Sequence, residues 1–523
     1  MIHRCKAIIV NKKFFYGVLL VAMLVQTFPF GLRYFPFSDD WFSLGMFSMY
    51  RSNIWSEAVL RYGLHGFRPL AGLLEVYVLS AFWPNMWIVL LGMVLLRFFA
   101  ILMLDNILEK CKITWGRAAT VFFAFFPTLT ESTYWLSASV RIVAGSFLSI
   151  LAAYAILNFI NRENRKQWLV IAIVCGFFAN GFYEQGIIFT FVLTMGVMLI
   201  NYRKIKSKLL FIWPFANLAT IGVHYIVFRD VNPWLNTRAG VEQNIFRQFP
   251  QTLSVIGRTF VREQAPTVSR SFRWGFEFLF REHLILVLIV IVLSVTLAIF
   301  VAHDSRENNN KLRSVFVAII LFACTLSVFF VITSSDIFVR NFYYSLIGLA
   351  ILGEVTVRFI PWRAVKAALA GLMIFVFLSG YILEVDTLRR IEHYDSKIIA
   401  NLVDELDCNN DIWLFGVRWV YSPSINPRYT SQIRIDWAAT AHFRYVYKSR
   451  NGTRPTNWIT PVMSGYTVTL DFTERNVFGI LPHTQDVKRL EFDGHNLLIA
   501  DTGEIFGYLE PASYDRFVFR IVG

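Results

Sequence analysis

The stretch Phe35-Pro36-Phe37-Ser38-Asp39-Asp40-Trp41 directly follows the first long apolar segment of the chain, residues 14–34. It places two adjacent carboxylates where a membrane helix would meet water. Burying one charge at this boundary is costly, and two neighbouring carboxylates also repel each other. A polar loop that ends the helix, with Trp41 as an interface anchor, would explain the pair without any function. The rest of the chain favours a site.

The composition is that of a polytopic membrane protein. Of 523 residues, 56% are hydrophobic and only 16% are charged, whereas soluble domains carry about 25% charged residues. About eleven apolar segments are long enough to cross a bilayer as helices. They cover residues 14–34, 86–106, 118–134, 140–160, 168–182, 186–201, 209–228, 284–302, 313–333, 342–360 and 367–384. No small-residue cleavage site follows the basic N-terminus, so we expect the first segment to be retained.

The distribution of charge predicts the orientation of these helices. With a cytoplasmic N-terminus, the inside loops collect clusters of Lys and Arg near residues 4–13, 110–117, 162–166, 203–208, 306–313 and 358–366. The net charge of +14 is therefore a positive-inside signal, and we expect no nucleic-acid partner. Asp39 and Asp40 then lie outside. The apolar stretch Pro69–Trp83 would reverse every later loop if it crossed the membrane, so we expect an interfacial helix there.

Two domains are expected. Residues 1–384 form an α-helical transmembrane domain, with a first extracytoplasmic loop at 32–85 and a long one at 229–283. Residues 385–523 form a small extracytoplasmic α+β domain, because its short alternating runs are punctuated by Gly, Pro and Asn. It should begin with an amphipathic helix over residues 386–407. Strands are expected over residues 411–420, 432–437, 443–447, 466–472, 487–492, 497–500 and 516–522.

Further polar residues gather at the turns that this orientation places outside. Each of them, taken singly, is more often a solvated helix cap than part of a site. Their convergence on one face is typical of a functional site, because charges at membrane boundaries are usually paired or functional. These residues are His65, Arg68, Glu131, Arg141, Tyr183, Glu184, Arg340 and Tyr343.

The arrangement resembles the GT-C superfamily of membrane glycosyltransferases, which includes the aminoarabinose transferase of lipid A and the protein O-mannosyltransferases. Like them, the chain has one span, an acidic motif and a first outside loop with two surface helices. Ser38-Asp39-Asp40-Trp41 resembles their acidic motif. Arg68-Pro69-Leu70 resembles a basic Pro-Pro-Leu motif with one proline fewer, and Glu131 stands where relatives often carry a further acid. The likeness covers about residues 10–200.

This resemblance implies an inverting transfer of a sugar from a polyprenyl-phosphate donor. The acceptor would be a cell-envelope glycan, lipid or protein at the outer face of the inner membrane. An acceptor hydroxyl is a poor nucleophile, so a carboxylate must take its proton. Asp40 and Asp39 are the first candidates for this base, and Glu131 is the third. The aspartate pair is also the candidate site for a divalent metal ion, and we expect no other cofactor.

The leaving lipid phosphate gains negative charge as the bond to the sugar breaks, and fixed cations must meet that charge. Arg68 and Arg141 are the first candidates, because the arginine fork binds phosphate through two hydrogen bonds. His65 and Arg340 follow them. Glu184, Tyr183 and Tyr343 are further candidates for the site.

Two alternatives stay open at the level of sequence. A polymerase or ligase of the O-antigen type also joins glycans outside the membrane, and its large late loop could correspond to residues 229–283. A transporter would bind its substrate near mid-membrane between two repeated halves. We find no second copy of the first-half pattern, and the charges gather at one face. In every case membrane lipid surrounds the chain.

Overall fold

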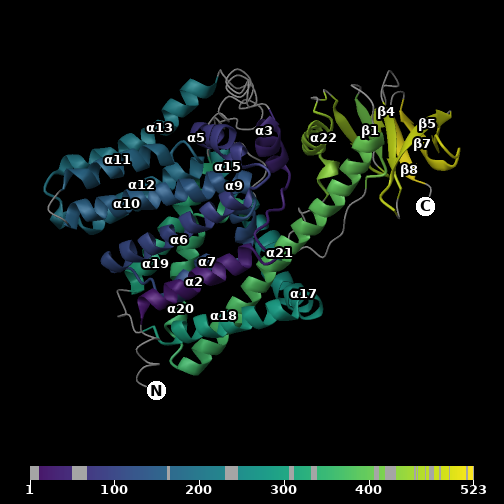
Figure 1. Cartoon of the computed structure of the whole chain (residues 1–523). Helices are drawn as coiled ribbons and strands as arrows, with labels where there is room; N and C mark the ends of the chain where they lie inside the picture. Colours follow the sequence, from purple (N-terminus) through teal and green to yellow (C-terminus); the bar gives the residue numbers. More distant parts are fainter. Residues whose placement is uncertain are drawn as a thin grey trace. The chain divides into compact units, whose positions relative to one another are not determined.

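The computed structural model describes residues 11–49, 68–161, 165–229, 245–304, 311–330, 339–405, 411–417, 431–452, 455, 457–465, 467–469, 476–481, 484–493, 495–513 and 516–521. Contacts divide the chain into two compact units. Unit 1 comprises Met1–Tyr34 and Asn53–Val385, and unit 2 comprises Phe35–Ser52 and Asp386–Gly523. The long helix α21, Arg363–Glu405, contributes residues to both (Figure 1). The acidic stretch of the first loop thus belongs by its contacts to the unit that holds the C-terminal sheet.

Unit 1 is helical throughout its described part. Helices α10, α11 and α12 lie side by side, and α10 also packs on α6 (Figure 1). Short π-helical and 3-10 turns, η4 (Leu74–Val78) and η5 (Leu79–Phe82), continue α5. The helices are α2 (Lys12–Thr27), α5 (Pro69–Leu73), α6 (Trp87–Lys110), α7 (Arg117–Phe125), α8 (Thr130–Thr133), α9 (Leu136–Ser139), α10 (Gly145–Asn161), α11 (Lys166–Ala179), α12 (Glu184–Ile200), α13 (Ile212–Arg229), α15 (Ile245–Thr259), α16 (Ala265–Arg270), α17 (Phe276–Glu282), α18 (Leu284–Ala302), α19 (Lys311–Leu326) and α20 (Leu346–Val357).

A helix lies in each of the predicted apolar segments. Within the described residues, four helical stretches are long and apolar enough to cross a membrane: Trp87–Lys110, Leu136–Asn161, Leu284–Ala302 and Arg363–Glu405. Further apolar helices, such as Glu184–Ile200, are shorter. The mostly helical membrane protein is therefore confirmed, while the number of eleven spans stays a prediction.

Helix α18 has one buried face and one exposed apolar face. Val287 and Val290 are buried against the rest of unit 1, whereas Ile285, Leu288 and Val292 are exposed. The exposed residues recur at helical spacing and form an apolar stripe. Water would disfavour such a stripe, so it fits a face in contact with lipid.

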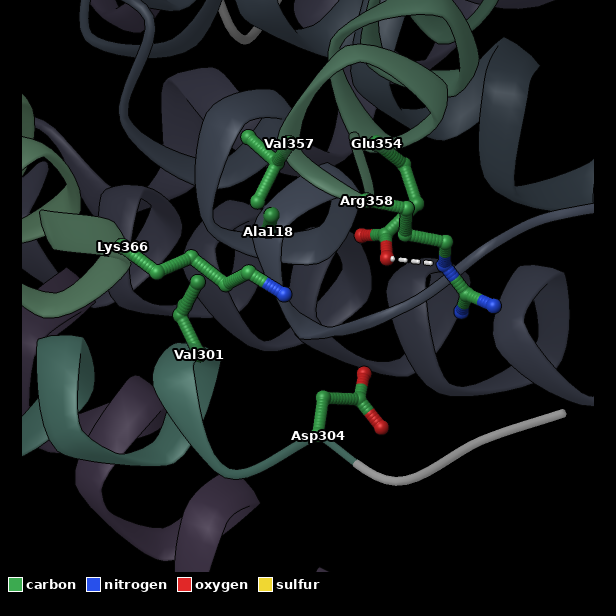
Figure 2. A pocket seen from close by; sticks show the side chains of 7 residues that line it. All are labelled: Ala118, Val301, Asp304, Glu354, Val357, Arg358 and Lys366. Carbon is green, nitrogen blue, oxygen red and sulfur yellow. Dashed lines mark hydrogen bonds and ion pairs between the residues drawn. The ribbon is translucent and has the colours of Figure 1, made fainter. Parts of the chain in front are cut away.

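The N-terminus of α7 lies against two carboxylates. Asp304 Oδ2 accepts the backbone N–H of Arg117 at 2.8 Å, and Glu354 Oε2 accepts that of Ala119 at 2.9 Å. These bonds satisfy N–H groups that every helix start leaves without a partner, and the helix dipole favours negative charge there. A Cβ on Gly116 would lie 2.3 Å from Glu354 Oε1, so no side chain fits at this position. Figure 2 shows both carboxylates at the wall of a small cavity.

Unit 2 is built on a sheet whose described strands run in the order β2-β1-β4-β5-β6-β7-β8-β3. β1 pairs in parallel with β2 and β4, and the remaining pairs are antiparallel. Helix α22, Asp436–Asn451, lies between β1 and β2 in the sequence, which is the crossover that a parallel pair requires. The strands are β1 (Ile412–Phe415), β2 (Ile459–Val462), β3 (Thr467–Thr469), β4 (Asn476–Ile480), β5 (Val487–Asp493), β6 (Asn496–Ile499), β7 (Ile505–Ser513) and β8 (Arg516–Ile521).

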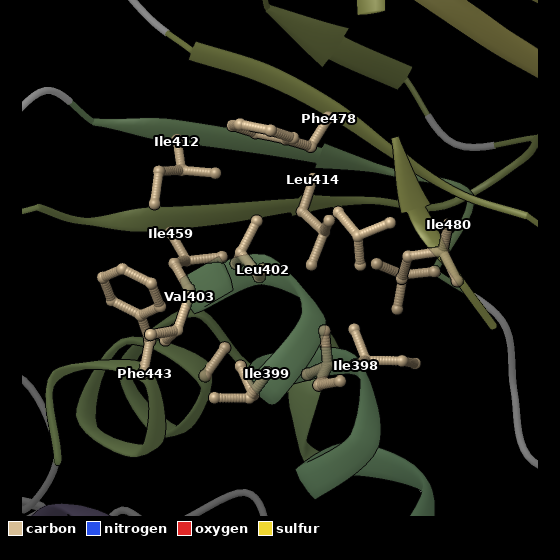
Figure 3. Close-up of a cluster of buried hydrophobic side chains, with 14 residues drawn as sticks. Ile398, Ile399, Leu402, Val403, Ile412, Leu414, Phe443, Ile459, Phe478 and Ile480 are labelled. Atoms are coloured by element: carbon tan, nitrogen blue, oxygen red, sulfur yellow. The ribbon is translucent and has the colours of Figure 1, made fainter. Parts of the chain in front are cut away.

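Strand β1 separates two apolar clusters. Ile412 and Leu414 point to the face covered by α21 and α22, where they meet Leu402 of α21 and Phe443 of α22 (Figure 3). Trp413 and Phe415 point to the opposite face, where they join a second cluster with residues of β5 to β8. Side chains alternate between the two faces of a strand, so a strand that is buried on both sides is apolar throughout.

The structure confirms the C-terminal sheet. The helix expected over residues 386–407 is present, but it continues the last apolar segment without a break as α21, Arg363–Glu405. Two of the expected strands are wrong. Phe443–Tyr447 lies inside α22, and Gln432–Trp437 forms a 3-10 turn that leads into the same helix. Such short apolar runs are compatible with the repeat of a helix and with that of a strand. In the structure Phe443 packs on α21 and the sheet from within a helix. The strands β2, β4 and β7 were not expected.

Candidate functional site

Three arginine–glutamate pairs join distant segments of unit 1. Arg68 Nε lies 2.9 Å from Glu184 Oε1, Arg141 Nε lies 2.8 Å from Glu75 Oε1, and Arg340 Nη1 lies 3.0 Å from Glu131 Oε1. Each pair is partly or fully shielded from solvent. Five of the six residues come from the turns whose charges the sequence singles out, so unit 1 does bring most of those charges into pairs.

The first pair is fixed by the start of two helices. Pro69 occupies the first turn of α5, which places Arg68 just before the helix. Both Nε and Nη2 of Arg68 donate to the Glu184 carboxylate, at 2.9 and 3.0 Å, and Glu184 begins α12. The Leu70 backbone N–H donates to Gly181 O at 2.9 Å. A Cβ on Gly181 would lie 2.5 Å from Leu70 Cγ, so a glycine permits this close approach.

The pair of Glu131 and Arg340 joins α8 to the turn before α20. Both oxygens of the buried Glu131 carboxylate accept hydrogen bonds from Arg340, one from Nη1 at 3.0 Å and one from the backbone N–H at 3.3 Å. The Arg340 guanidinium also lies over the Trp135 ring, 4.7 Å from its centroid. These two bonds hold both the guanidinium and the backbone of Arg340, so Glu131 orients this arginine. Its role as a third candidate for the base stays a prediction.

Tyr183 connects the pairs. The Arg68 guanidinium lies 4.4 Å from the centroid of the Tyr183 ring. On the other side, Asn341 Nδ2 donates to the Tyr183 hydroxyl at 2.5 Å, and Asn341 directly follows Arg340. Arg68 therefore lies against the Tyr183 ring, and Arg340 lies one residue from the hydrogen-bond partner of its hydroxyl, so one buried tyrosine links two of the ion pairs. The three ion pairs with Tyr183 and Asn341 are called the arginine cluster below.

The three arginines differ in how far they can reach a ligand. The side chains of Arg68 and Arg340 are 26% and 21% exposed, whereas that of Arg141 is 12% exposed. Arg141 Nε and Nη2 donate to the Glu75 carboxylate at 2.8 and 3.0 Å. Glu75 lies on η4 and is fully buried. Arg68 and Arg340 are thus the more accessible cations of the cluster.

Glu75 and Asn341 are members of the cluster that the sequence did not single out as site residues. Glu75 lies in the apolar stretch expected on the membrane surface, where its charge suited contact with water. A carboxylate within an apolar helix usually needs a cationic partner, and this rule could have identified it. Asn341 carries no charge and follows Arg340, so only its contact with Tyr183 reveals its role.

Two other residues that the sequence predicts for the site do not join the described cluster. The Tyr343 side chain is buried in the core of unit 1, with its ring 5.5 Å from that of Phe123. It therefore supports the helices behind the cluster. His65 lies outside the described residues.

The aspartate pair belongs to unit 2. Ser38 adopts a positive φ of 47°, and this turn lets Asp40 Oδ2 accept the Phe37 backbone N–H at 3.0 Å. Asp40 is fully buried at the start of η1 (Trp41–Met46), whereas Asp39 is half-buried. Asp40 thus holds the turn together, and Asp39 is the more accessible carboxylate.

The segment after Asp40 packs on helix α22 of the same unit. The Trp41 ring stacks on the ring of His442, with centroids 3.6 Å apart and an interplanar angle of 12°. Lys448 Nζ donates to Met49 O at 2.9 Å. Burial lowers the pKa of His442 to about 3, so the ring is neutral at ordinary pH. The C-terminal domain therefore fixes the backbone that carries both aspartates.

A metal site is not evident in the described part of the chain. No group of three or more His, Cys, Asp or Glu side chains there is arranged to hold a metal ion. Asp39 and Asp40 alone supply fewer ligands than a divalent cation takes from an all-protein site. The chemistry that the described residues do support is the binding of an anion by arginines.

A comparison with known protein families identifies the kind of protein. The family model for Glucosyl transferase GtrII matches residues 63–353, more than half of the chain, and this region contains all six members of the three pairs. No curated protein and no solved structure matches. The expected resemblance to membrane glycosyltransferases is confirmed, and the match favours an enzyme over a transporter. The chain belongs to the glucosyl transferase GtrII family and is a membrane glycosyltransferase.

Proposed function

We propose that the protein transfers a glucosyl group from a polyprenyl-phosphate donor to a cell-envelope acceptor. The family name supports glucose as the sugar, and the acidic motif of the first loop supports a GT-C type of enzyme. In this proposal the protein lies in the inner membrane with a cytoplasmic N-terminus. Transfer takes place at the outer face, where the C-terminal domain also lies.

The observation that carries the proposal is the pair of partly exposed arginines, Arg68 and Arg340, which Tyr183 and Asn341 link to each other. A lipid-linked sugar donor has a phosphate as its leaving group, and that phosphate gains charge as the glycosidic bond breaks. Fixed guanidinium groups in a partly shielded site stabilise such charge without reorganisation. Arg68 and Arg340 carry this role in the proposal, because they are the more exposed of the three.

The glutamates have a supporting role. Each holds the guanidinium plane of its arginine in one orientation, and each offsets the cost of burying that charge. Arg68 uses Nε and Nη2 for Glu184, so its Nη1 edge is directed away from that carboxylate. A phosphate oxygen can be bound at this edge while the ion pair stays intact.

The reaction itself is a single displacement. The acceptor oxygen attacks the anomeric carbon, the bond from that carbon to the phosphate oxygen breaks, and the configuration inverts. The acceptor proton passes to a carboxylate. We propose that this carboxylate is Asp39 or Asp40. Asp39 is the first choice, because its side chain is more exposed than that of Asp40.

The test measures donor binding and transfer separately. Arg68→Lys and Arg340→Lys keep the charge but remove the fork, which a lysine cannot replace for bidentate binding. Purified variants in nanodiscs are titrated with polyprenyl phosphate, and envelope glycans from cells that express each variant are analysed by mass spectrometry. We expect weaker binding of polyprenyl phosphate and about 10²-fold less transfer for each variant.

A matched control uses an arginine–glutamate pair at the surface. Arg281 pairs with Glu277 at 2.8 Å, with side chains 76% and 47% exposed, and lies in the same unit. Arg281→Lys should bind and transfer like the unchanged protein. If both cluster variants bound polyprenyl phosphate with unchanged affinity, the arginine cluster would not be the phosphate site.

A further inference from the structure

A second charged site lies at the other end of unit 1. A cavity of about 150 Å³ is lined by the ends of α18 and α20 and the starts of α7 and α21 (Figure 2). Helix α20 begins at Leu346, shortly after Arg340, and ends at Val357 beside this cavity. Its 12 residues span about 18 Å. The cavity is therefore separate from the three arginine–glutamate pairs.

One wall of the cavity presents fixed acceptors. Asp304 and Glu354 are held by the backbone N–H groups at the start of α7, and Glu354 Oε1 also accepts Arg358 Nε at 2.8 Å. These hydrogen bonds fix the position of both carboxylates at the start of α7. Their charge thus faces a small polar space that is shaped by packed helix ends.

The opposite wall presents a cation. Lys366 is half-buried, and Figure 2 shows its ammonium group pointing into the cavity. Among the described residues its Nζ makes no ion pair or hydrogen bond. A half-buried ammonium group without a partner favours an anionic ligand atom. The cavity therefore offers a donor on one side and acceptors on the other.

Exposed apolar side chains lie next to the cavity. Ile299 of α18 is exposed a short distance before Asp304, and Trp362 and Val365 are exposed beside Lys366. Tryptophan at the end of a membrane helix is typical of the headgroup level of the bilayer. A ligand whose charged part enters the cavity would find room for apolar chains along these helices. Apolar chains next to a charged cavity favour a membrane lipid as the ligand.

We propose that the cavity binds the headgroup of a zwitterionic phospholipid with a primary amine, such as phosphatidylethanolamine. The lipid phosphate accepts hydrogen bonds from Lys366, and the ammonium group donates to the carboxylates of Asp304 and Glu354. A choline headgroup has no N–H to donate to these carboxylates. A phosphatidylglycerol headgroup carries no ammonium group, so it could meet Lys366 but would leave the carboxylates of Asp304 and Glu354 without the ion pair that the amine makes.

The experiment measures lipid retention and thermal stability of the full chain in nanodiscs. Nanodiscs are made with phosphatidylcholine alone or with added phosphatidylethanolamine or phosphatidylglycerol, and co-purified lipid is counted by native mass spectrometry. We expect retention and a raised unfolding temperature with phosphatidylethanolamine only. Lys366→Gln should weaken this retention about tenfold, the loss of one charge-assisted hydrogen bond.

The control is Arg363→Gln, which removes a neighbouring exposed cation that does not line the cavity. It should retain the lipid as the unchanged protein does. Lys366 has no protein partner among the described residues, so its substitution should leave the fold intact. Equal retention of all three lipids, a preference for phosphatidylglycerol, or unchanged retention in Lys366→Gln would overturn the proposal.

Discussion

Removing one member of the buried Glu75–Arg141 pair should destabilise unit 1 strongly. The two side chains are 1% and 12% exposed, and two hydrogen bonds of 2.8 and 3.0 Å join them. Arg141→Met leaves the Glu75 carboxylate buried without its cation. Breaking a buried ion pair in this way costs about 3–5 kcal/mol. The free energy of unfolding of a folded protein is only about 5–15 kcal/mol, so this loss should clearly lower the unfolding midpoint.

The double variant Glu75→Leu with Arg141→Met distinguishes the pair from its separate charges. It removes both ions and replaces them with apolar side chains of similar length. Such replacements of a buried pair are often neutral or stabilising. We therefore expect the double variant to regain most of the stability that the single variant loses. It should also keep most of the transfer activity, because Arg68 and Arg340 carry the proposed phosphate contacts.

The assay is the unfolding midpoint of purified protein in detergent, followed by size-exclusion chromatography after heating. Arg281→Met serves as the control, since an exposed ion pair contributes only about 0–1 kcal/mol. The reasoning fails if Arg141→Met unfolds at the same temperature as the unchanged protein. It also fails if the double variant is as unstable as Arg141→Met alone.

Three further predictions concern single positions. Gly116→Ala should lower the unfolding midpoint, because its Cβ would lie 2.3 Å from a carboxylate oxygen, whereas Gly92→Ala, with nothing within 4 Å, should not. Burial lowers the pKa of His442 to about 3 from 6.5, so the unfolded chain binds a proton first and stability should fall as pH drops from about 6.5 toward 3. His442→Phe should remove that part of the pH dependence of the unfolding midpoint. Asp39→Asn or Asp40→Asn should reduce glycan transfer about 10²–10⁴-fold without changing protein yield in membranes; normal transfer in both variants would exclude the pair as the base.

The candidate site was predicted in part. The sequence indicated Arg68, Glu131 and Arg340 because they are charges at the ends of apolar segments, a pattern that local reading detects. Which charge pairs with which could not be predicted, since the partners are separated by long stretches of chain. Glu75 shows the limit most clearly. A surface helix and a buried helix can share one apolar pattern, and only packing against Arg141 shows that this carboxylate is enclosed.

The sequence by itself determined the helices of the membrane part and the existence of a separate C-terminal sheet. A bilayer leaves no other partner for backbone N–H and C=O groups, so a long apolar run must form a helix wherever it packs. The tertiary structure alone decided that the acidic stretch packs with the C-terminal unit, through the contact of Trp41 with His442. It also decided that Phe443 belongs to a helix rather than a strand. Both outcomes depend on contacts between residues far apart in the chain, and such contacts leave no mark in local periodicity.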